Sequence, residues 1–193
     1  MISLSTVSCR DPEFLRWLRR HYTGSRGAPP GKKICVRIEE DGRLVGFFGL
    51  AEPSYKLAPR RRLVGRTPVE QAQLDAARPL PHTVTNFVFR LEGHHAKASS
   101  LLVVAERFAL DAWASRAWST GRAPRPEHIE TMIGQGDARN PGACFKRVGY
   151  RSLGMTTGRS ARRPPGATHG ARIWQDAAPK LVLYHGPLAR RGS

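Results

Sequence analysis

The sequence has few of the residues that cross-link a chain or hold it in a membrane. Its 193 residues include three cysteines, Cys9, Cys35 and Cys144, without a Cys-x-x-Cys pair. An odd number of scattered cysteines argues against a disulfide framework and a zinc finger, and we expect Cys35, in the apolar run KICVRI, to be a reduced core thiol. No stretch approaches the ~20 apolar residues of a membrane span, and the start lacks the apolar core of a signal peptide. The sequence therefore predicts a soluble, cytoplasmic protein without a membrane partner.

Acidic residues are also scarce. The chain has 15 Asp and Glu against 32 Lys and Arg, which gives a formal net charge of +17. A balance this far from neutral is typical of proteins with a polyanionic partner, and we expect nucleic acid ahead of an acidic membrane surface. Two alternatives stay open: basic residues can simply solvate the surface, and part of the charge can serve an anionic cofactor.

The length of the chain is sufficient for one domain with its own core. We expect a single domain over residues 1–188 and a frayed tail over 189–193. Two basic stretches rich in proline and glycine have the composition of insertions, near 54–81 and 158–173. The first contains a short helix that begins near Thr67, with Pro68 at its first position.

Hydrophobic periodicity and turn residues predict the first elements. Residues 2–7 suit a first strand, and residues 11–22 form an amphipathic helix with Asp11 as N-cap and Pro12 at its first position. Two apolar runs, 32–40 and 43–53, flank Asp41-Gly42, a pair typical of a hairpin turn.

The stretch from 82 to 157 is the most informative. A strand-like run (82–92) precedes a long helix (96–116), a second apolar run (128–137) and a closing segment (140–158), and a last strand follows over 180–188. This order is that of a βαβαβ unit with parallel strands. We therefore predict an α/β (α+β) fold, a mixed sheet flanked by helices, in which a phosphate-bearing cofactor binds where the central strand meets its helix.

Helix, hairpin and crossover helix in this order resemble the GNAT acyltransferase fold, which implies acetyl-CoA or a related acyl donor. GNAT proteins carry a Gln/Arg-x-x-Gly-x-Gly/Ala loop between the central strand and its helix. Arg90, Gly93 and a trailing small residue match this loop, with a longer spacing into the helix. Ser99 and Ser100 at the helix start either donate hydroxyl groups to the pyrophosphate or are ordinary helix-start residues.

Further motifs resemble the Mom family of phage DNA-modification proteins. These GNAT-like proteins convert adenine in phage DNA to an N6-carbamoylmethyl derivative, which protects the DNA from restriction. The stretch 16–33 (RWLRRHYTGSRGAPPGKK) resembles the family's opening motif, and later pieces follow in the family's order: Asn86, Ser100, Asp137 and the Gly-x-x-Phe-Lys segment 142–146. The resemblance spans roughly residues 16–159 and implies an enzyme that modifies DNA adenine. The layout is also similar to a domain of bacterial anti-phage defence systems.

The chain departs from the family pattern at two positions. The family tends to place Arg directly after the strand Asn, where this chain has Phe87, and Arg90 lies three residues further on. The aromatic residue before Lys146 is usually Tyr and here is Phe145, whose ring cannot donate a proton. The resemblance places Phe145 at the cofactor together with Arg90, Ser99 and Ser100, and it leaves open whether the nearby Tyr150 takes the acid role.

Three residues are candidates for the chemistry of transfer. The N6 lone pair of adenine is delocalised into the ring, so its reaction needs a base or a polarising group. Asp137, at the C-terminal end of a sheet strand, is our candidate general base, while His21 can shuttle protons and Tyr22 can stack on a flipped base. The resemblance also implies iron, with His21 and Asp137 as ligands. Each residue has a structural alternative: a turn or cap for Asp137, a helix-end cation for His21 and a core-edge aromatic for Tyr22.

Two arginine-rich segments are candidates for contacts with DNA phosphates. One contains Arg60, Arg61, Arg62 and Arg66, and the other contains Arg159, Arg162, Arg163 and Arg172. Such contacts give steep salt dependence and little sequence information. The alternative is that these arginines are only solvated.

The leading hypothesis is a Mom-like enzyme that transfers an acyl-derived, carbamoylmethyl-like group to adenine N6 in DNA. An ordinary GNAT N-acetyltransferase of a protein, tRNA or small amine is the first alternative. A non-catalytic nucleic-acid-binding protein on a GNAT scaffold is the second, favoured by the imperfect cofactor loop. Binding of CoA and the appearance of modified DNA distinguish the three.

Overall fold

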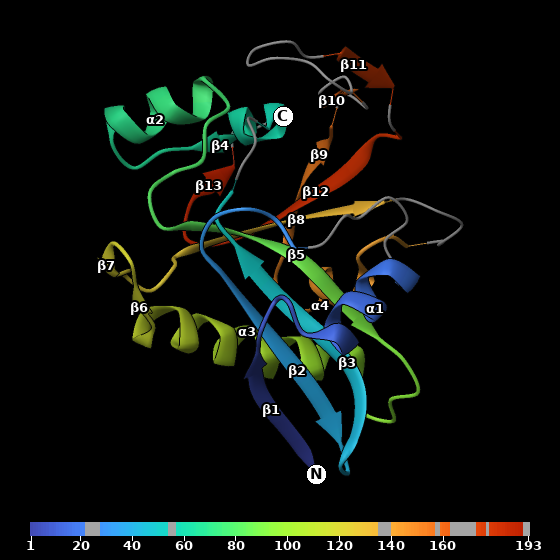
Figure 1. Cartoon of the computed structure of the whole chain (residues 1–193). Helices are drawn as coiled ribbons and strands as arrows, with labels where there is room; N and C mark the ends of the chain where they lie inside the picture. Colours follow the sequence, from blue (N-terminus) through green and yellow to red (C-terminus); the bar gives the residue numbers. More distant parts are fainter. Residues whose placement is uncertain are drawn as a thin grey trace.

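Seven strands form the central sheet, in the order β1-β2-β3-β5-β8-β12-β9 (Figure 1). The computed structural model describes residues 1–21, 28–53, 57–134, 140–156, 159–162, 173–176 and 178–190. The strands are β1 (Ile2–Val7), β2 (Lys33–Glu40), β3 (Arg43–Ala51), β5 (Thr83–Leu91), β8 (His128–Gly134), β12 (Lys180–His185) and β9 (Arg151–Met155). Strands β5 and β8 are parallel, and each other neighbouring pair of this sheet is antiparallel.

Helices cover both faces of the sheet. Because side chains alternate along a strand, Ile34 and Val36 of β2 point into a core with α3 (Ala98–Ser115) and α4 (Ala143–Arg147), while Cys35 points to the other face. On that second face Phe14 of α1 (Pro12–His21) packs edge-on against Phe47 of β3, at 5.2 Å between ring centroids. The predicted helices over 11–22 and 96–116 are confirmed to within two residues at each end.

Local signals in the sequence fix the start of α1 and the β2–β3 turn. Asp11 Oδ1 accepts hydrogen bonds from the backbone N–H groups of Glu13 and Phe14, both at 2.9 Å, so Asp11 is the predicted N-cap. Asp41 and Gly42 have φ values of 52° and 75°, the left-handed conformations of a two-residue hairpin turn.

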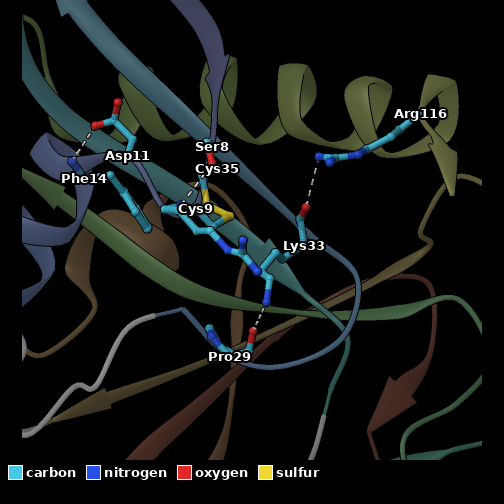
Figure 2. The surroundings of a disulfide bond; sticks show 9 residues. Ser8, Cys9, Asp11, Phe14, Pro29, Lys33, Cys35 and Arg116 are labelled. Carbon is cyan, nitrogen blue, oxygen red and sulfur yellow. Dashed lines mark hydrogen bonds between the residues drawn. A yellow bond between two sulfur atoms is a disulfide. The ribbon is translucent and has the colours of Figure 1, made fainter. Parts of the chain in front are cut away.

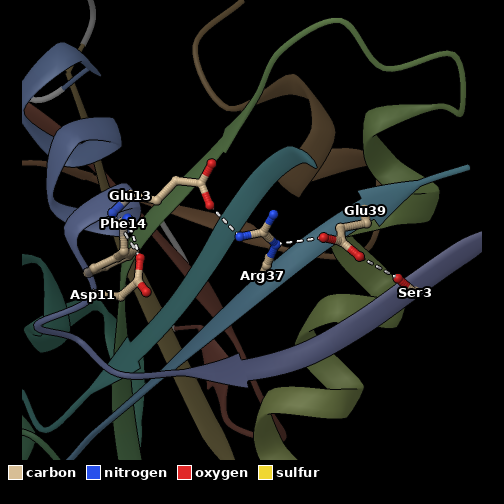
Figure 3. A network of polar contacts seen from close by, with 6 residues as sticks. All are labelled: Ser3, Asp11, Glu13, Phe14, Arg37 and Glu39. Atoms are coloured by element: carbon tan, nitrogen blue, oxygen red, sulfur yellow. Dashed lines mark hydrogen bonds and ion pairs between the residues drawn. The ribbon is translucent and has the colours of Figure 1, made fainter. Parts of the chain in front are cut away.

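An ion-pair network holds α1 onto the edge of the sheet (Figure 3). The Arg37 guanidinium on β2 donates to Glu13 of α1 and, over 2.7 Å, to Glu39 Oε1 on its own strand. Ser3 on β1 donates to the other oxygen of Glu39. These hydrogen bonds raise the pKa of Arg37, chiefly through Glu39, and lower the pKa of Glu39 through Arg37. The network therefore connects three elements at one edge.

A disulfide joins Cys9 and Cys35 (Figure 2), so the prediction of a reduced Cys35 is wrong. The physical reason is the register of β1 and β2, in which Val7 lies opposite Cys35. The chain turns immediately after Val7, and this turn brings Cys9 back beside Cys35 with 5.9 Å between the Cα atoms, a separation that a disulfide spans. Cys144 is a free, half-buried thiol, and burial raises its pKa.

The first basic insertion packs onto the sheet as a small layer of its own. It contains the 3₁₀ helix η1 (Ala58–Arg62), β4 (Leu63–Val64) and α2 (Pro68–Asp75). Thr67 and Glu70 form a reciprocal capping box at the start of α2, which confirms the helix start predicted near Thr67. A second core lies beneath this layer, formed by Leu57, Leu63, Leu74, Leu80, Leu153, Val182, Tyr184 and Leu188.

Several short strands complete the described part of the chain. They pair as β6 (Ala117–Trp118) with β7 (Gly121–Arg122), β10 (Arg159–Arg162) with β11 (Ile173–Asp176), and β13 (Ala189–Arg190) with β4. The first two residues of the tail predicted to fray thus take part in a strand pair. Among the helices of the described residues, none has both the length and the apolar character that crossing a membrane requires.

Candidate active site

The parallel strands β5 and β8 separate toward their C-terminal ends. They pair over four positions, from Thr83 with His128 to Asn86 with Thr131, although β5 continues to Leu91 and β8 to Gly134. Beyond Asn86 the side of β5 that faces β8 no longer takes part in that ladder. The C-terminal ends of parallel strands are where α/β sheets bind ligands, so this gap is the candidate active site.

A β-bulge at Phe87 creates the divergence, and Asn86 holds it. In the pairing of β3 with β5, Gly49 lies opposite Val88 and Leu50 opposite Asn86, so Phe87 is the extra residue. The buried Asn86 Nδ2 donates to the carbonyl oxygens of Gly49 (3.0 Å) and Val88 (2.9 Å). Thr131 Oγ1 donates to Asn86 O and Oδ1, at 3.3 and 3.2 Å. The asparagine found in the sequence thus has a structural role at the last paired position of β5.

The loop from 92 to 97 leads from β5 into an α3 N-terminus without a side-chain cap. Lys97 is the N-cap residue, no acidic side chain lies in the first turn, and Ser99 and Ser100 both fall in that turn. Ser99 is half-buried and Ser100 is exposed. The N-terminus of a helix of 18 residues carries a partial positive charge and favours an anion.

The loop itself binds an oxyanion, supplied by the chain. The backbone N–H groups of His95 and Ala96 donate to Glu40 Oε2 (2.6 Å) and Oε1 (2.8 Å), one to each oxygen of the carboxylate. The hydrogen bond from His95 is the largest cause that lowers the pKa of Glu40. Arg43, on the other side of the hairpin turn, donates to Gly93 O. The loop therefore presents converging N–H groups, which is the geometry that a phosphate group requires.

The end of α1 lies beside this loop. Arg20 Nη1 is 3.3 Å from Glu92 Oε2, which brings the last turn of α1 next to the loop. His21 is the last residue of α1, and its side chain is outside the described structure. Tyr22 and Asp137 also lie outside the described residues, Asp137 three positions beyond Gly134. Their roles, and the iron site predicted from His21 and Asp137, stay predictions.

Arg90 and Phe145 have different environments. Arg90 is exposed on the C-terminal part of β5, opposite Phe47 of β3. Phe145 has 5% of its surface exposed and packs edge-on between Phe89 (5.6 Å) and Tyr150 (5.1 Å). The prediction that Phe145 contacts the cofactor is therefore corrected: its ring is part of the core beneath the diverging strand.

The motifs of the sequence did not indicate a polar cluster around the buried Glu106. Tyr150 Oη donates to Glu106 Oε2 (2.7 Å), and His185 Nδ1 lies 3.0 Å from Glu106 Oε1. Burial, and then the Glu106 charge, raise the pKa of Tyr150 well above its usual value. The hydroxyl of Tyr150 is thus committed to Glu106. The sequence does contain a signal for this cluster. Helical spacing places Glu106 on the same apolar face as Leu102, Ala105 and Ala109, which predicts a buried carboxylate there.

The arginines predicted to bind DNA are not all on the surface of the protein. Arg60 is 1% exposed and donates from Nε and Nη2 to the two carboxylate oxygens of Glu130, at 2.7 and 2.6 Å. Its assignment to nucleic-acid binding is corrected, because the core holds it away from any phosphate. Arg61, Arg62 and Arg66 are exposed. The Arg162 side chain and all of Arg163 lie outside the described structure.

No cluster of three or more His, Cys, Asp or Glu side chains suited to a metal occurs among the described residues. What the described part does bring together is a gap between two parallel strands, an oxyanion-binding loop, a helix N-terminus and the end of α1. This arrangement is suited to holding a phosphate-bearing cofactor along β5, with its distal end in the gap.

No family model matches the sequence, and no curated protein matches it significantly. Solved structures are similar in fold. An acetyltransferase from Bacillus subtilis in complex with CoA aligns over 97% of this chain and 99% of its own, with a TM-score of 0.52 and 10% identity. An IAA acetyltransferase from Bacillus cereus aligns over 95% and 98%, with a TM-score of 0.51 and 10% identity.

A third solved structure, a GNAT family acetyltransferase from Elizabethkingia anophelis with acetyl-CoA bound, aligns over 96% of this chain and 98% of its own, with a TM-score of 0.50 and 8% identity. At such identities the likeness shows the fold. The predicted GNAT-like mixed sheet flanked by helices is thereby confirmed.

Proposed function

We propose that this protein transfers an acyl-type group from a CoA thioester to an acceptor amine at the gap between β5 and β8. The observation that carries the proposal is the pair of N–H groups, from His95 and Ala96, that already bind the Glu40 carboxylate beside the α3 N-terminus. A pyrophosphate is also an oxyanion and fits the same donors. Ser99 and Ser100 can add hydroxyl donors, and Arg90 a charge, at the same end of β5.

The gap supplies the geometry for the transfer step. Past the bulge at Phe87, the edge of β5 that faces β8 offers backbone groups to the amides of the cofactor arm. When bound, the acyl-CoA thioester would supply the activated carbonyl, and CoA would leave as the thiol once the C–S bond is replaced by the new C–N bond. The protein's part is to orient it, to exclude water and to remove a proton from the acceptor amine.

Where the motif of the Mom family usually has a Tyr that can donate a proton, the described residues of this chain supply no equivalent acid. Phe145 has no hydroxyl, and the Tyr150 hydroxyl is bonded to Glu106. We propose Asp137 as general base, because it follows the strand that borders the gap, and His21 and Tyr22 at the acceptor side, because α1 ends beside the loop.

We further propose DNA as the acceptor, with adenine N6 as the modified atom, as the resemblance to the Mom family implies. The net charge of +17 supports a polyanionic substrate. The exposed Arg61, Arg62 and Arg66 carry backbone contacts, and Arg162 and Arg163 are further candidates. The target base has to leave the stack to reach the gap.

One observation favours a non-catalytic nucleic-acid-binding protein as second candidate. The Glu40 carboxylate occupies two of the N–H groups that a cofactor phosphate needs. If the contact of Glu40 with His95 and Ala96 is permanent, these N–H groups are not available to CoA. The basic surface of the protein then serves only to bind nucleic acid.

Two measurements on the full chain test the proposal. Calorimetric titration with CoA shows whether the loop takes a phosphate-bearing ligand. Mass spectrometry of nucleosides, from the DNA of cells that express the protein, shows whether adenosine is modified, with Asp137→Ala as control. A new adenosine species absent from the control supports the proposal. CoA binding with unmodified DNA indicates an ordinary acetyltransferase, and DNA binding without CoA binding indicates the second candidate.

A further inference from the structure

A second basic site lies on the far side of the molecule from the candidate active site. A groove of about 740 Å³ runs between the turn after β1, the start of β2 and the last turn of α3. Its cationic lining consists of Arg10, Lys33 and Arg116, and hydroxyl groups come from Thr6, Ser8 and Ser115. No acidic residue is among the described residues that line it. The volume is that of an ordinary ligand site.

Three basic residues elsewhere on the surface pair with carboxylates, whereas the cations of the groove have no such partner among the described residues. Lys32, Arg20 and Arg125 each pair with an acidic side chain, respectively Glu52, Glu92 and Asp111. Within the described part of the chain, no ion pair joins Arg10, Lys33 or Arg116 to an acid. Asp11, next to Arg10 in sequence, is used as the cap of α1. The lining of the groove therefore carries three positive charges without a counter-charge from the described residues, which favours a bound anion.

Two of the cationic side chains of the groove, Lys33 and Arg116, are held in place by contacts within the protein (Figure 2). Lys33 Nζ donates to Pro29 O. Arg116 Nη1 lies 3.5 Å from Lys33 O, and its guanidinium stacks 4.9 Å from the centre of the Trp118 ring. A guanidinium fixed in this way retains N–H groups for a further acceptor.

The Cys9–Cys35 disulfide fixes the wall of the groove. Cys9 lines the groove between Ser8 and Arg10, and its bond to Cys35 ties this turn to β2 (Figure 2). A site whose wall cannot move away loses less conformational freedom when a ligand binds.

The groove is separate from the cofactor site. Val7 pairs with Cys35 at its edge, Lys33 pairs with Ala51, and Ala51 pairs with Thr85 near the start of β5. The groove thus lies at the end of the sheet where β5 begins, while the candidate active site lies where β5 ends. A phosphate bound in the groove would therefore not belong to the cofactor. It would belong to a second ligand, or to a distant part of a long substrate.

We propose that this groove binds backbone phosphates of nucleic acid, through Arg10, Lys33 and Arg116. The choice of nucleic acid as the ligand rests on the proposed function. The groove would add a contact with the substrate's phosphate backbone at a distance from the active site. An extended polyanion suits an open groove on a chain with a net charge of +17. Contacts of this kind position the nucleic acid and carry no sequence preference.

Fluorescence anisotropy of a labelled duplex oligonucleotide tests the proposal. The full chain is compared with the double variant Arg10→Ala, Arg116→Ala. The control is Arg107→Ala, Arg147→Ala, which removes the same charge from exposed positions on α3 and α4 outside the groove. We expect the groove variant to bind about tenfold more weakly and the slope of log K against log salt to fall by about 2, at roughly 0.9 for each lost phosphate contact. The control changes both values by much less.

Each other outcome overturns the proposal. Equal losses in the groove variant and the control mean that only total charge matters. A second outcome is that the groove variant keeps its DNA affinity, while inorganic pyrophosphate binds to the wild-type protein and not to the variant. This outcome assigns the groove to a small phosphorylated ligand. If the unmodified protein binds no DNA, the nucleic-acid part of the proposed function fails too. A wild-type protein that binds and modifies DNA, with no effect of the groove variant, leaves the proposed function intact and rejects the groove alone.

Discussion

Arg60 and Glu130 form a bidentate ion pair inside the protein, with 1% and 2% of their side chains exposed. Arg60 belongs to the inserted 3₁₀ helix and Glu130 to the central strand β8, so the pair joins the insertion to the sheet. Arg60 Nη1 also donates to Ala77 O at 2.9 Å. The pair is therefore part of the frame that positions β8, the strand that borders the candidate active site.

Replacing Arg60 by Ala leaves the Glu130 carboxylate buried without its partner. We expect a loss of about 3–5 kcal/mol in the free energy of unfolding, the usual effect of removing one member of a buried pair. Urea denaturation measures it. Arg61→Ala, on the exposed neighbouring position, is the matched control, with an expected change within about 0.5 kcal/mol. The double variant Arg60→Met, Glu130→Leu should recover most of the loss, and a loss as large as that of Arg60→Ala would contradict the ion-pair account.

Glu40→Gln tests whether the loop amides are a phosphate site. The substitution removes a negative charge that accepts from His95 and Ala96, so we expect CoA to bind several-fold more tightly. Glu39→Gln is the control, because Glu39 faces Arg37 and Ser3 on the same strand pair. Calorimetric titration measures both affinities. Equal CoA affinity in Glu40→Gln and the wild-type protein would remove this loop from the cofactor site.

The His185–Glu106 contact predicts a pH-dependent contribution to stability. The hydrogen bond to Glu106 raises the pKa of His185 in the folded state. The contribution is thus fully present below the pKa of the unfolded chain, near 6.5, and is lost as the pH rises through the higher folded pKa. It is small, because His185 is 41% exposed and solvent screens the pair.

Thermal unfolding of the wild-type protein and His185→Gln, measured between pH 6 and pH 9, isolates this effect. The difference between their melting temperatures should shrink toward high pH. The comparison is necessary because burial lowers the pKa of His128, whose contribution grows as the pH rises through about 6.5 and is common to both proteins. A difference that stays constant with pH would show that folding does not raise the pKa of His185.

The Cys9–Cys35 disulfide should stabilise the fold by about 3.5 kcal/mol, the value for a closed loop of this size. The sequence separation is 26 residues. Denaturant unfolding with and without a reductant measures the effect. Cys9→Ser should show the same loss of stability as the reduced wild-type protein, and the reductant should have no further effect on this variant. Thiol counting in the unfolded, unreduced protein should give one free thiol, from Cys144. Three free thiols would show that the bond does not form.

The elements of this fold were readable because their signals are local. Asp11 and Thr67 cap helices with contacts two to three residues away, and Asp41-Gly42 sets its turn by its own dihedral angles. Periodicity then indicated which residues of the long helix face the core, and the order of elements indicated the sheet.

The contacts that correct the sequence predictions join distant parts of the chain. Composition shows three consecutive arginines, 60–62, and gives no reason why the first is buried, since its partner Glu130 lies 70 residues further on. The Cys9–Cys35 bond depends in the same way on the register of β1 with β2. Residues that meet only through tertiary packing leave no local pattern. Glu106 is the exception, because a carboxylate on the apolar face of a helix is itself a local pattern.

The four residue pairs between β5 and β8 have a consequence for the mechanics of the whole sheet. On one side of them lie β1, β2 and β3, and on the other lie β12, β9 and the inserted layer. A ligand bound in the gap beyond Asn86, as proposed for the cofactor, would contact both halves where the pairing of β5 with β8 ends. Such a ligand would link the two halves of the sheet. The sheet would therefore be more rigid when the ligand is bound than when it is absent.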